Sequence, residues 1–254
     1  MRIEEARIIR RWIEGLDLPP GAVCLNIGSS TAIFRERTQP HIHAELIAPL
    51  EQQGVHLIHC DMKAEAGVDE VGDLLDPVYR ARLQAYNAHV IICSNLLEHL
   101  SDPVQFANAC GELVRPGGHG IFTVPYSYPY HPDPIDTMLR PNPAELAGML
   151  RGWTAVRSEV VESGNHWSDL QQSAEPWRRL FRQMGRAMMP FYRSSQWRHV
   201  SHRLLWLWRP FTSSAVLLQK PALTACAGDY DSDLQVRHKS DGVPDLALPP
   251  GTAC

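Results

Sequence analysis

Hydrophobic and polar positions along this chain follow two alternating patterns, which predict short buried strands separated by helices. Between Ile9 and Leu16, apolar residues recur at helical spacing, and a Pro-Pro-Gly run at 19–21 ends the pattern. We therefore expect an amphipathic helix over 2–16. Continuous apolar runs that end in glycine or a polar residue are typical of buried strands. Such runs predict strands at 23–27, 55–60, 68–71, 89–93, 120–124, 153–161 and 211–219.

Three of the intervening helices share one start signal, a capping side chain followed by proline at the first helical position. In the third of them, Glu145 adds the acidic residue that completes a capping box. Strands alternating with such helices predict an α/β, Rossmann-like, doubly wound and mostly parallel sheet, with helices on both faces. The three start signals are Asp76-Pro77, Asp102-Pro103 and Asn142-Pro143.

The chain is long enough for one domain and an addition, and we divide it into three parts. Residues 1–165 are expected to form the core with its N-terminal helix. Residues 166–221 are expected to add basic, aromatic helices and the last strand of the core sheet. Over 222–254 the periodicity is lost, which predicts a disordered tail.

Composition narrows the class of protein. The 254 residues are 44% hydrophobic and 20% charged with a net charge of -4, which is ordinary for a soluble globular protein. The six cysteines form no CxxC pair, so we expect buried reduced thiols, a cytoplasmic location and no metal site. The charged N-terminus is not a secretory signal, and no apolar run approaches the ~20 residues of a spanning helix.

One segment differs from the rest of the chain in its composition and charge. Pro176 to Phe211 contains no Asp or Glu but eight arginines and four of the seven tryptophans. Arginine with tryptophan and leucine on amphipathic helices is typical of attachment to an anionic membrane surface, which would place the protein at the inner face of a membrane. The alternative is a helical cap whose tryptophans pack on the sheet. Nucleic-acid binding is disfavoured because no reading module is recognisable and the chain is net acidic.

Polar residues follow four successive strands of the expected sheet. Gly28-Ser29-Ser30 follows the first strand, Asp61 the second, Asp73 the third and Ser94-Asn95 the fourth. Parallel strands place their carboxyl ends at one edge of the sheet, where open α/β sheets bind ligands. We therefore expect these residues to form a single pocket.

The run from 90 to 125 resembles a known family. An apolar strand leads into Leu97-Glu98-His99, then a helix, then Arg115-Pro116-Gly117-Gly118 and a second apolar strand. This order resembles the second half of the class I S-adenosylmethionine (SAM) methyltransferase domain, and the resemblance extends over about 20–165. It implies a seven-stranded sheet, SAM as cofactor and methyl transfer as the reaction.

The resemblance also implies cofactor-binding residues. The turn after the first strand would hold the amino-acid part of SAM, Asp61 the ribose and Asp73 the adenine, while Asn95 would lie near the transferred methyl. Glu45 is an alternative ribose ligand, because the gap between the first turn and Asp61 is long. The residues of the first turn are Asn26, Gly28, Ser29 and Ser30.

The first turn departs from the family pattern. Asn26 stands where the family has an acidic residue, and Ser30 and Ala32 replace later glycines. Serine hydroxyls and an asparagine amide still offer hydrogen bonds to the carboxylate or ammonium group of the ligand. We interpret these residues as features of a subgroup.

The loop after the fifth strand is rich in candidates for the acceptor site. His131 and His99 are candidate general bases, because imidazole titrates near neutral pH, and Asp136 would orient His131. Tyr126, Tyr130 and Arg140 would bind the acceptor, Arg140 by gripping an anionic group. The alternative is a rigid packed lid in which Asp136 and Arg140 form a structural pair.

Together these observations predict a SAM-dependent methyltransferase acting on an unidentified acceptor, such as an oxygen of a glycan, a lipid-linked compound or a small metabolite. One alternative is a NAD-dependent sugar-modifying oxidoreductase, which would need a GxGxxG turn and a Tyr-x-x-x-Lys pair that the sequence lacks. The other is a non-catalytic protein of the same fold that binds a membrane or another protein.

Overall fold

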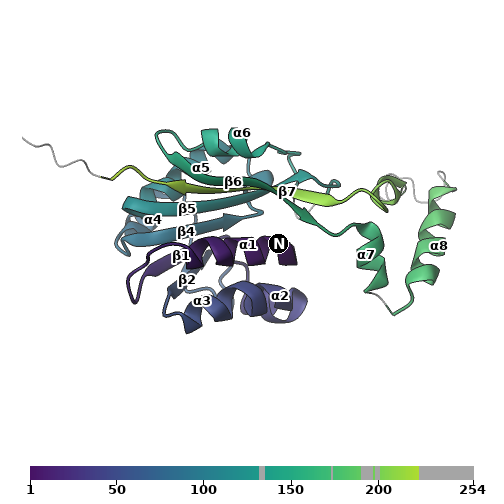
Figure 1. Cartoon of the computed structure of the whole chain (residues 1–254), viewed down its shortest axis with the longest axis horizontal. Coiled ribbons are helices and arrows are strands. Elements are labelled where there is room, and N and C mark those ends of the chain that lie inside the picture. The colour runs from purple at the N-terminus through teal and green to yellow at the C-terminus, as the bar shows by residue number, and fades with distance from the viewer. Residues whose placement is uncertain (132–134, 173, 190–196, 198–200, 223–254) are drawn as a thin grey trace, which may run out of the picture. The chain divides into compact units, whose positions relative to one another are not determined.

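A seven-stranded sheet forms the centre of the protein in the computed structural model (Figure 1). Its strands are β1 (Val23–Ile27), β2 (His56–Asp61), β3 (Glu70–Val71), β4 (Ala88–Ser94), β5 (Val114–Ser127), β6 (Thr154–Ser163) and β7 (Phe211–Gln219). They lie in the order β3-β2-β1-β4-β5-β7-β6, with β1 to β5 parallel and β7 antiparallel to both neighbours. This mixed, mostly parallel sheet confirms the expected α/β fold.

The structure describes residues 1–131, 135–172, 174–189, 197 and 201–222. All of these belong to one unit, Met1–Leu223. The expected tail at 222–254 lies outside the described residues except for its first position.

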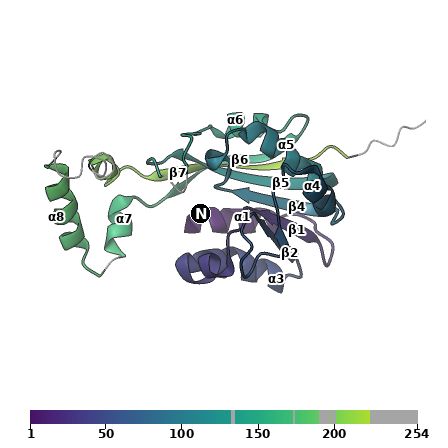
Figure 2. The same cartoon turned by 180° about the vertical axis from the view of Figure 1, so that it is seen from behind.

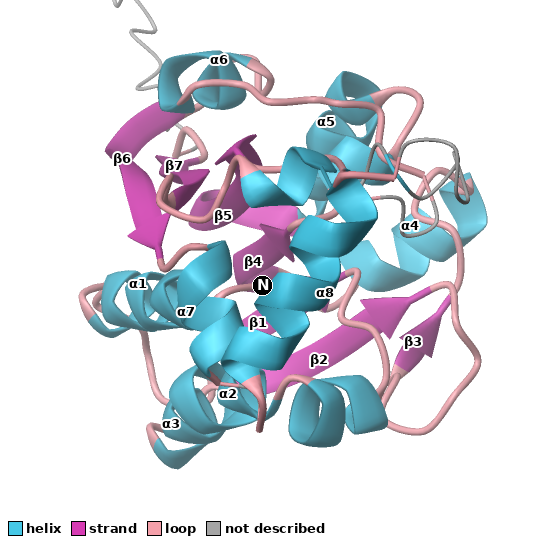
Figure 3. Ribbon diagram, turned by 90° about the vertical axis from the view of Figure 1, so that its right-hand side faces the viewer, coloured by secondary structure: helices cyan, strands magenta, loops and turns pink. Residues whose placement is uncertain are grey.

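Helices cover both faces of the sheet (Figure 3). They are α1 (Ile3–Glu14), η1 (Phe34–Thr38), α2 (Pro40–Ile42), η2 (His43–Ile47), α3 (Ala48–Gln52), α4 (Pro77–Gln84), η3 (Leu97–His99), α5 (Pro103–Leu113), α6 (Pro143–Gly148), α7 (His166–Gln171) and α8 (Pro176–Ala187). The elements from α1 to α3 pack on one face, and α4, α5 and α6 pack on the other, which Figure 2 shows from behind. Among the described residues, no helix combines the length and apolar character needed to span a bilayer.

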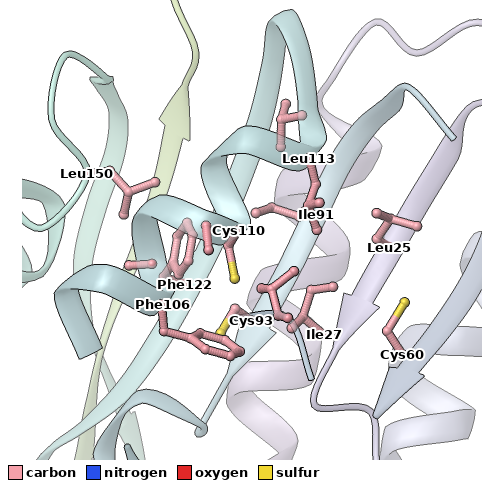
Figure 4. Close-up of a cluster of buried hydrophobic side chains, with 14 of the residues drawn as sticks. Leu25, Ile27, Cys60, Ile91, Cys93, Phe106, Cys110, Leu113, Phe122 and Leu150 are labelled. Atoms are coloured by element: carbon pink, nitrogen blue, oxygen red, sulfur yellow. The ribbon is translucent and has the colours of Figure 1, made fainter. Parts of the chain in front are cut away.

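Successive side chains of the central strand β4 point into two hydrophobic clusters on opposite faces of the sheet. Ile91 and Cys93 point into the cluster beneath α4 and α5, and Val90 and Ile92 point into the cluster beneath α1 and α3. Figure 4 shows the first cluster, in which the Phe106 side chain of α5 lies close to β4. Because both faces of the strand are buried over Val90–Cys93, every position there is apolar, as the sequence pattern predicts. Four cysteines are free and buried, as expected: Cys24, Cys60, Cys93 and Cys110.

The three expected helix caps are confirmed. Asp76 accepts a hydrogen bond from the Val78 amide at 3.0 Å, and Asp102 accepts one from the Gln105 amide at 2.8 Å. Asn142 and Glu145 form the reciprocal capping box at 3.0 and 2.9 Å. These caps fix where α4, α5 and α6 begin.

Three expectations about the strands and loops need correction. The strand expected at 68–71 pairs only over Glu70–Val71, because the Asp69 carboxylate accepts a hydrogen bond from the His59 amide at 2.8 Å. The long gap between the first turn and the second expected strand, for most of which the sequence predicts no element, contains the helical segments η1, α2, η2 and α3. The fifth strand begins at Val114, before the expected turn, and its pairing with β4 is irregular there.

Helices α7 and α8 follow β6 and lie beyond one end of the strands (Figures 1 and 2). An ion pair of 2.8 Å between Arg2 and Asp169 joins α7 to the start of α1. Helix α8 has no buried residue. Within the described part of the expected addition, α7 and α8 are helices; α7 contacts the core, and α8 is exposed.

Candidate functional site

A cavity of about 980 Å³ lies at the carboxyl ends of the parallel strands. Its walls come from the turn after β1, the ends of β2 and β4, the first turn of α1, and α7. A second cavity of about 230 Å³ adjoins it. Both are lined by Gly28, Asp61, Lys63 and Leu96, so they form two compartments of one site.

The turn after β1 is held rigidly by the rest of the protein. Gly28 has φ +71°, and a Cβ atom there would lie 2.7 Å from Leu96 Cδ2, so only glycine fits without strain. The Ser30 amide donates to Asp61 Oδ2 at 2.7 Å. Gly28, Ser29 and Ser30 all line the larger cavity, as expected.

Arg35, which the sequence patterns did not indicate as a site residue, holds this turn in place. Its buried guanidinium donates to the carbonyl oxygens of Ser29 and Ser30 at 3.1 and 2.6 Å, and to that of Gly67 at 2.6 Å. The only indication of this role in the sequence is an arginine on the buried side of a helical segment. That helix was not apparent, because its apolar positions are few.

Asn26 lines the larger cavity and contacts His59 on the neighbouring strand. The Asn26 amide nitrogen lies 3.2 Å from His59 Nδ1, and because an amide N–H only donates, the imidazole nitrogen accepts. Burial, together with the charge of Arg35, lowers the pKa of His59 to about 4. His59 is therefore neutral at physiological pH.

The smaller cavity is mainly apolar. Its walls include Ile27, Met62, Leu74 and Phe106, and Asp73 lies among them. Asp73 Oδ1 accepts a hydrogen bond from the Leu75 amide at 2.9 Å. This compartment offers a mainly apolar space with two carboxylates, those of Asp61 and Asp73.

Of the two expected ribose ligands, the structure places one in the site. Asp61 lines both compartments, and its Oδ1 also accepts from the Lys63 amide at 3.1 Å. Glu45 lines neither compartment, because it forms an ion pair of 2.7 Å with Arg7 on α1. The alternative that named Glu45 is therefore wrong.

Asn95 follows β4 and lines the larger cavity. Its φ is +51°, and its amide donates to Glu5 Oε1 at 3.1 Å and to Ser94 Oγ at 3.2 Å. Glu5, from α1, is almost fully buried and lines the same cavity. Sequence analysis missed it, although an acidic residue four positions before Ile9 lies on the apolar face of that helix.

At the far end of the larger cavity, a carboxyl group lies beside two imidazoles. Glu98 is fully buried, and neither carboxyl oxygen has a hydrogen-bond partner among the described residues. Glu98 Oε1 lies 3.7 Å from His99 Nε2 and 4.0 Å from His131 Nε2. Burial raises the pKa of Glu98 to about 8 and lowers that of His131 below its ordinary value. His99 and His131 line the cavity, as expected for acceptor-site residues.

Asp136 lies behind His131 and does not line the cavity. Arg140 donates to its two oxygens at 3.0 and 2.6 Å, and the His131 and Met138 amides donate at 3.1 and 2.8 Å. Desolvation alone would raise the pKa of Asp136, but the hydrogen bonds from Arg140 and the two amides lower it to about 2. Asp136 is thus a fixed anion 3.3 Å from His131 Nδ1.

The expected acceptor-binding residues are placed differently. Arg140 lines neither cavity, because its guanidinium is paired with Asp136, as the structural alternative proposed. Tyr126 and Tyr130 also line neither cavity, and each is 40% exposed. Instead, Tyr128 lines the larger cavity, with its ring 5.3 Å from that of His131. β5 ends at Ser127, so no strand periodicity predicts which side chains of the following loop face inward.

Comparisons with known proteins agree with this geometry. No family model matches the chain. The ubiquinone biosynthesis O-methyltransferase of Vibrio atlanticus is 33% identical over 75 residues, which cover 30% of this chain and 29% of that protein. The enzyme of the same name from Yersinia pestis is 31% identical over 75 residues, covering 30% and 28%. The chain therefore matches less than a third of the length of these curated relatives.

A solved structure extends the likeness to most of the chain. Coclaurine N-methyltransferase bound to N-methylheliamine and SAH superposes with a TM-score of 0.52 at 13% identity, covering 85% of this chain and 70% of that one. Together with the strand order, this likeness shows that the chain has the fold of class I SAM-dependent methyltransferases. The fold expected from the sequence is confirmed.

Proposed function

We propose that this protein is a SAM-dependent methyltransferase that acts on a small-molecule acceptor. The observation that carries the proposal is the two-compartment cavity at the point where the strand order reverses, between β1 and β4. Open α/β sheets bind ligands at this point. The relatives with the same fold are named as methyltransferases.

The residues present fit SAM by their chemistry. The apolar smaller compartment suits an adenine ring, with Asp73 as a hydrogen-bond acceptor for it. Asp61, shared by both compartments, suits a ribose, because a carboxylate accepts hydrogen bonds from hydroxyl groups. The turn from Gly28 to Ser30 and the Asn26 amide then line the space for the amino-acid part. We assign these residues to cofactor binding.

When bound, SAM supplies a methyl group on a sulfonium, which is reactive toward an oxygen, nitrogen or carbon nucleophile. The protein's part is to align the acceptor and to exclude water. Asn95 and Glu5, which are hydrogen-bonded to each other, line the larger cavity and would position the reacting groups. His99 and His131 line the same cavity and would serve as bases for an acceptor hydroxyl, so we favour an oxygen acceptor.

Cofactor binding tests the proposal. Calorimetric titration of the full chain with SAM and with SAH should show binding at one site. Asp61→Ala should raise the dissociation constant about 10- to 150-fold, because it removes a charged hydrogen-bond acceptor worth roughly 1.5–3 kcal/mol. Glu45→Ala is the matched control and should leave the dissociation constant unchanged, since Glu45 lines neither compartment. Absence of binding in well-folded protein would instead favour a non-catalytic role for the fold.

A second feature, in α8, supports an acceptor that is presented at a lipid surface. Trp177, Phe181, Met184 and Met188 recur at helical spacing, and all four are exposed. An amphipathic helix with a bare apolar face and a basic polar face binds at the interface of anionic membranes. The arginines of this helix are Arg178, Arg179, Arg182 and Arg186.

Flotation of the full chain with vesicles tests this assignment of α8. The protein should float with phosphatidylglycerol-containing vesicles at low salt and remain unbound with phosphatidylcholine vesicles. The double change Trp177→Ser and Phe181→Ser should abolish flotation, whereas Val78→Ser, at an exposed position on α4, should not. Wild-type protein that stays unbound with the anionic vesicles would contradict the membrane contact and leave the assignment of the cofactor site untouched.

A further inference from the structure

We propose that Glu98, His99 and His131 form a binding site for a divalent cation at the acceptor end of the larger cavity. The sequence indicated no metal site, because the three residues belong to no familiar metal-binding spacing. Two of them follow β4, and the third follows the neighbouring strand β5. Strand pairing brings them together.

The distances suit a shared ion. The carboxylate oxygen and the two imidazole nitrogens all lie within 4.8 Å of one another. Ligands that surround one ion at about 2.1 Å lie roughly 3–3.5 Å apart, so the three atoms need to approach by about 1 Å. Rotations of the His99 and His131 side chains, which border open space in the cavity, can provide this movement.

The buried carboxyl group of Glu98 gives independent support. It is fully buried, yet neither oxygen has a hydrogen-bond partner in the described part of the chain. A buried carboxyl group without partners is costly, and buried charges in proteins are normally paired or bind metal ions. The nearby Asn95 amide does not reach it, because that amide donates to Glu5 and Ser94. A cation beside Glu98 Oε1 would satisfy the group.

Both imidazoles are oriented as metal ligands usually are. His99 Nδ1 contacts the carbonyl oxygen of Ile135, which only accepts, so Nδ1 carries the proton and the lone pair of Nε2 faces Glu98. His131 Nδ1 lies 3.3 Å from the Asp136 carboxylate without a hydrogen bond to it, and Nε2 lies 4.0 Å from Glu98 Oε1. An imidazole backed by a carbonyl or a carboxylate on its other nitrogen is the usual arrangement around a bound metal.

The chemistry of the ligands narrows the choice of ion. Two imidazoles and one carboxylate favour Zn²⁺, Mn²⁺ or another first-row ion over Ca²⁺ and Mg²⁺, which prefer all-oxygen ligands. Because His99 and His131 line the cavity, a cation held by these two residues and Glu98 would keep coordination positions open for water or a bound molecule, as in catalytic rather than structural sites.

The role of this cation rests on the proposed function. A cation beside an acceptor hydroxyl favours loss of the hydroxyl proton to water and so increases the nucleophilicity of the oxygen. In the transfer, that oxygen forms a bond to the methyl carbon, and the carbon–sulfur bond breaks with its electron pair passing to sulfur. Glu98, His99 and His131 would then act on the acceptor through the ion, in place of direct proton transfer to an imidazole.

Metal titration of the full chain, stripped of ions with EDTA, tests the site. ZnCl₂ should bind at one equivalent by calorimetry, and CoCl₂ should give visible absorption bands of a nitrogen- and oxygen-coordinated ion. His131→Gln and Glu98→Gln should weaken binding by more than the 10–100-fold typical of losing an outer-shell partner. His56→Gln, which changes an exposed histidine outside the cavity, is the matched control and should bind as wild type does.

Two outcomes would overturn the inference: no binding by the wild type, or equal binding by His131→Gln and the control. Should Glu98→Gln fail to fold, His131→Gln decides, because its side chain is one-third exposed and tolerates the change. SAM binding is measured in parallel. Cation binding without SAM binding would contradict only the proposed function, and SAM binding without cation binding would contradict only this inference.

Discussion

The two ends of the larger cavity differ in how their polar groups are satisfied. At the end we assign to the cofactor, Asp61, Arg35 and Asn26 are hydrogen-bonded to the protein itself, at distances of 2.6 to 3.2 Å. At the acceptor end, both oxygens of Glu98 and Nδ1 of His131 have no hydrogen-bond partner among the described residues. Asn26 and Arg35 are buried as Glu98 is, so burial alone does not explain the difference.

This contrast separates a preformed binding surface from one that is incomplete. Buried polar groups are almost always hydrogen-bonded, because an unpartnered one costs roughly 1–3 kcal/mol. The turn after β1 meets this requirement without a ligand and so holds its shape in the free protein. The cluster around Glu98 does not, and a ligand that satisfies it would stabilise the protein. Substitutions at the cofactor end should therefore destabilise the protein, whereas substitutions at Glu98 should leave its stability nearly unchanged.

The largest effect is expected at Arg35. Arg35→Ala removes a buried guanidinium that donates to three carbonyl oxygens, and we expect it to lower the free energy of unfolding by about 4 kcal/mol. Urea denaturation followed by circular dichroism measures this. Arg37→Ala, in the same helical segment but exposed, is the control and should change stability by less than about 0.5 kcal/mol. Equal stability of the two variants would mean that the turn does not depend on the guanidinium.

The next largest effect concerns His59 and pH. Its pKa falls from 6.5 in the unfolded chain to about 4 in the folded protein, so between these values only the unfolded chain binds the proton. Stability from this group is complete above pH 6.5 and is lost as the pH falls toward 4. The loss is up to about 3 kcal/mol, since each tenfold change in a protonation equilibrium is worth about 1.4 kcal/mol.

Comparing wild type with His59→Gln isolates this contribution, because other groups titrate in the same range. The free energy of unfolding, measured at pH 7 and pH 4.5, should decrease more in the wild type than in the variant. His56→Gln, at the exposed start of the same strand, should behave as the wild type does. Parallel pH profiles for wild type and His59→Gln would show that the buried imidazole is not held neutral by the fold.

Much of the cofactor end was predictable from sequence, because strand ends in a parallel sheet converge on one edge. The positions of Gly28, Asp61, Asp73 and Asn95 follow from that rule once the strands are located. Arg35 and Glu5 were not predicted, because neither follows a strand end. Glu5 reaches the site from α1, and Arg35 reaches it from η1. Side-chain length and direction, which sequence periodicity does not contain, place them there.

The acceptor end was predicted less well for a related reason. The residues of the loop after β5 were identified, but which of them face the cavity depends on an ion pair between Asp136 and Arg140. That pair turns Arg140 away from the acceptor and fixes Asp136 behind His131. In a loop without regular periodicity, such local pairs determine direction, and several pairings were equally compatible with the sequence.

A smaller effect is expected at Gly28. Gly28→Ala places a side chain at φ +71° and 2.7 Å from Leu96 Cδ2, which should cost about 1–2 kcal/mol. Because Leu96 lines both compartments, its displacement should also weaken SAM binding about tenfold. Calorimetry with SAM measures this, and Gly148→Ala, where no atom lies within 4 Å of the added Cβ, is the control. Unchanged SAM affinity in Gly28→Ala would show that the cofactor does not depend on this turn.

The smallest effect is expected at Glu98, and it tests the contrast between the two ends most directly. Glu98→Met removes both unpartnered oxygens at similar side-chain volume, so in EDTA it should leave the free energy of unfolding unchanged or raise it by up to about 1 kcal/mol. Glu5→Met is the matched control, since Glu5 is equally buried but accepts hydrogen bonds from Asn95 and from the Arg2 amide, and it should destabilise by about 2 kcal/mol. Thermal melts with and without ZnCl₂ measure both variants. A loss of stability at Glu98 as large as that at Glu5 would mean that its carboxyl group is already satisfied in the metal-free protein. The reason to expect a cation beside it would then disappear.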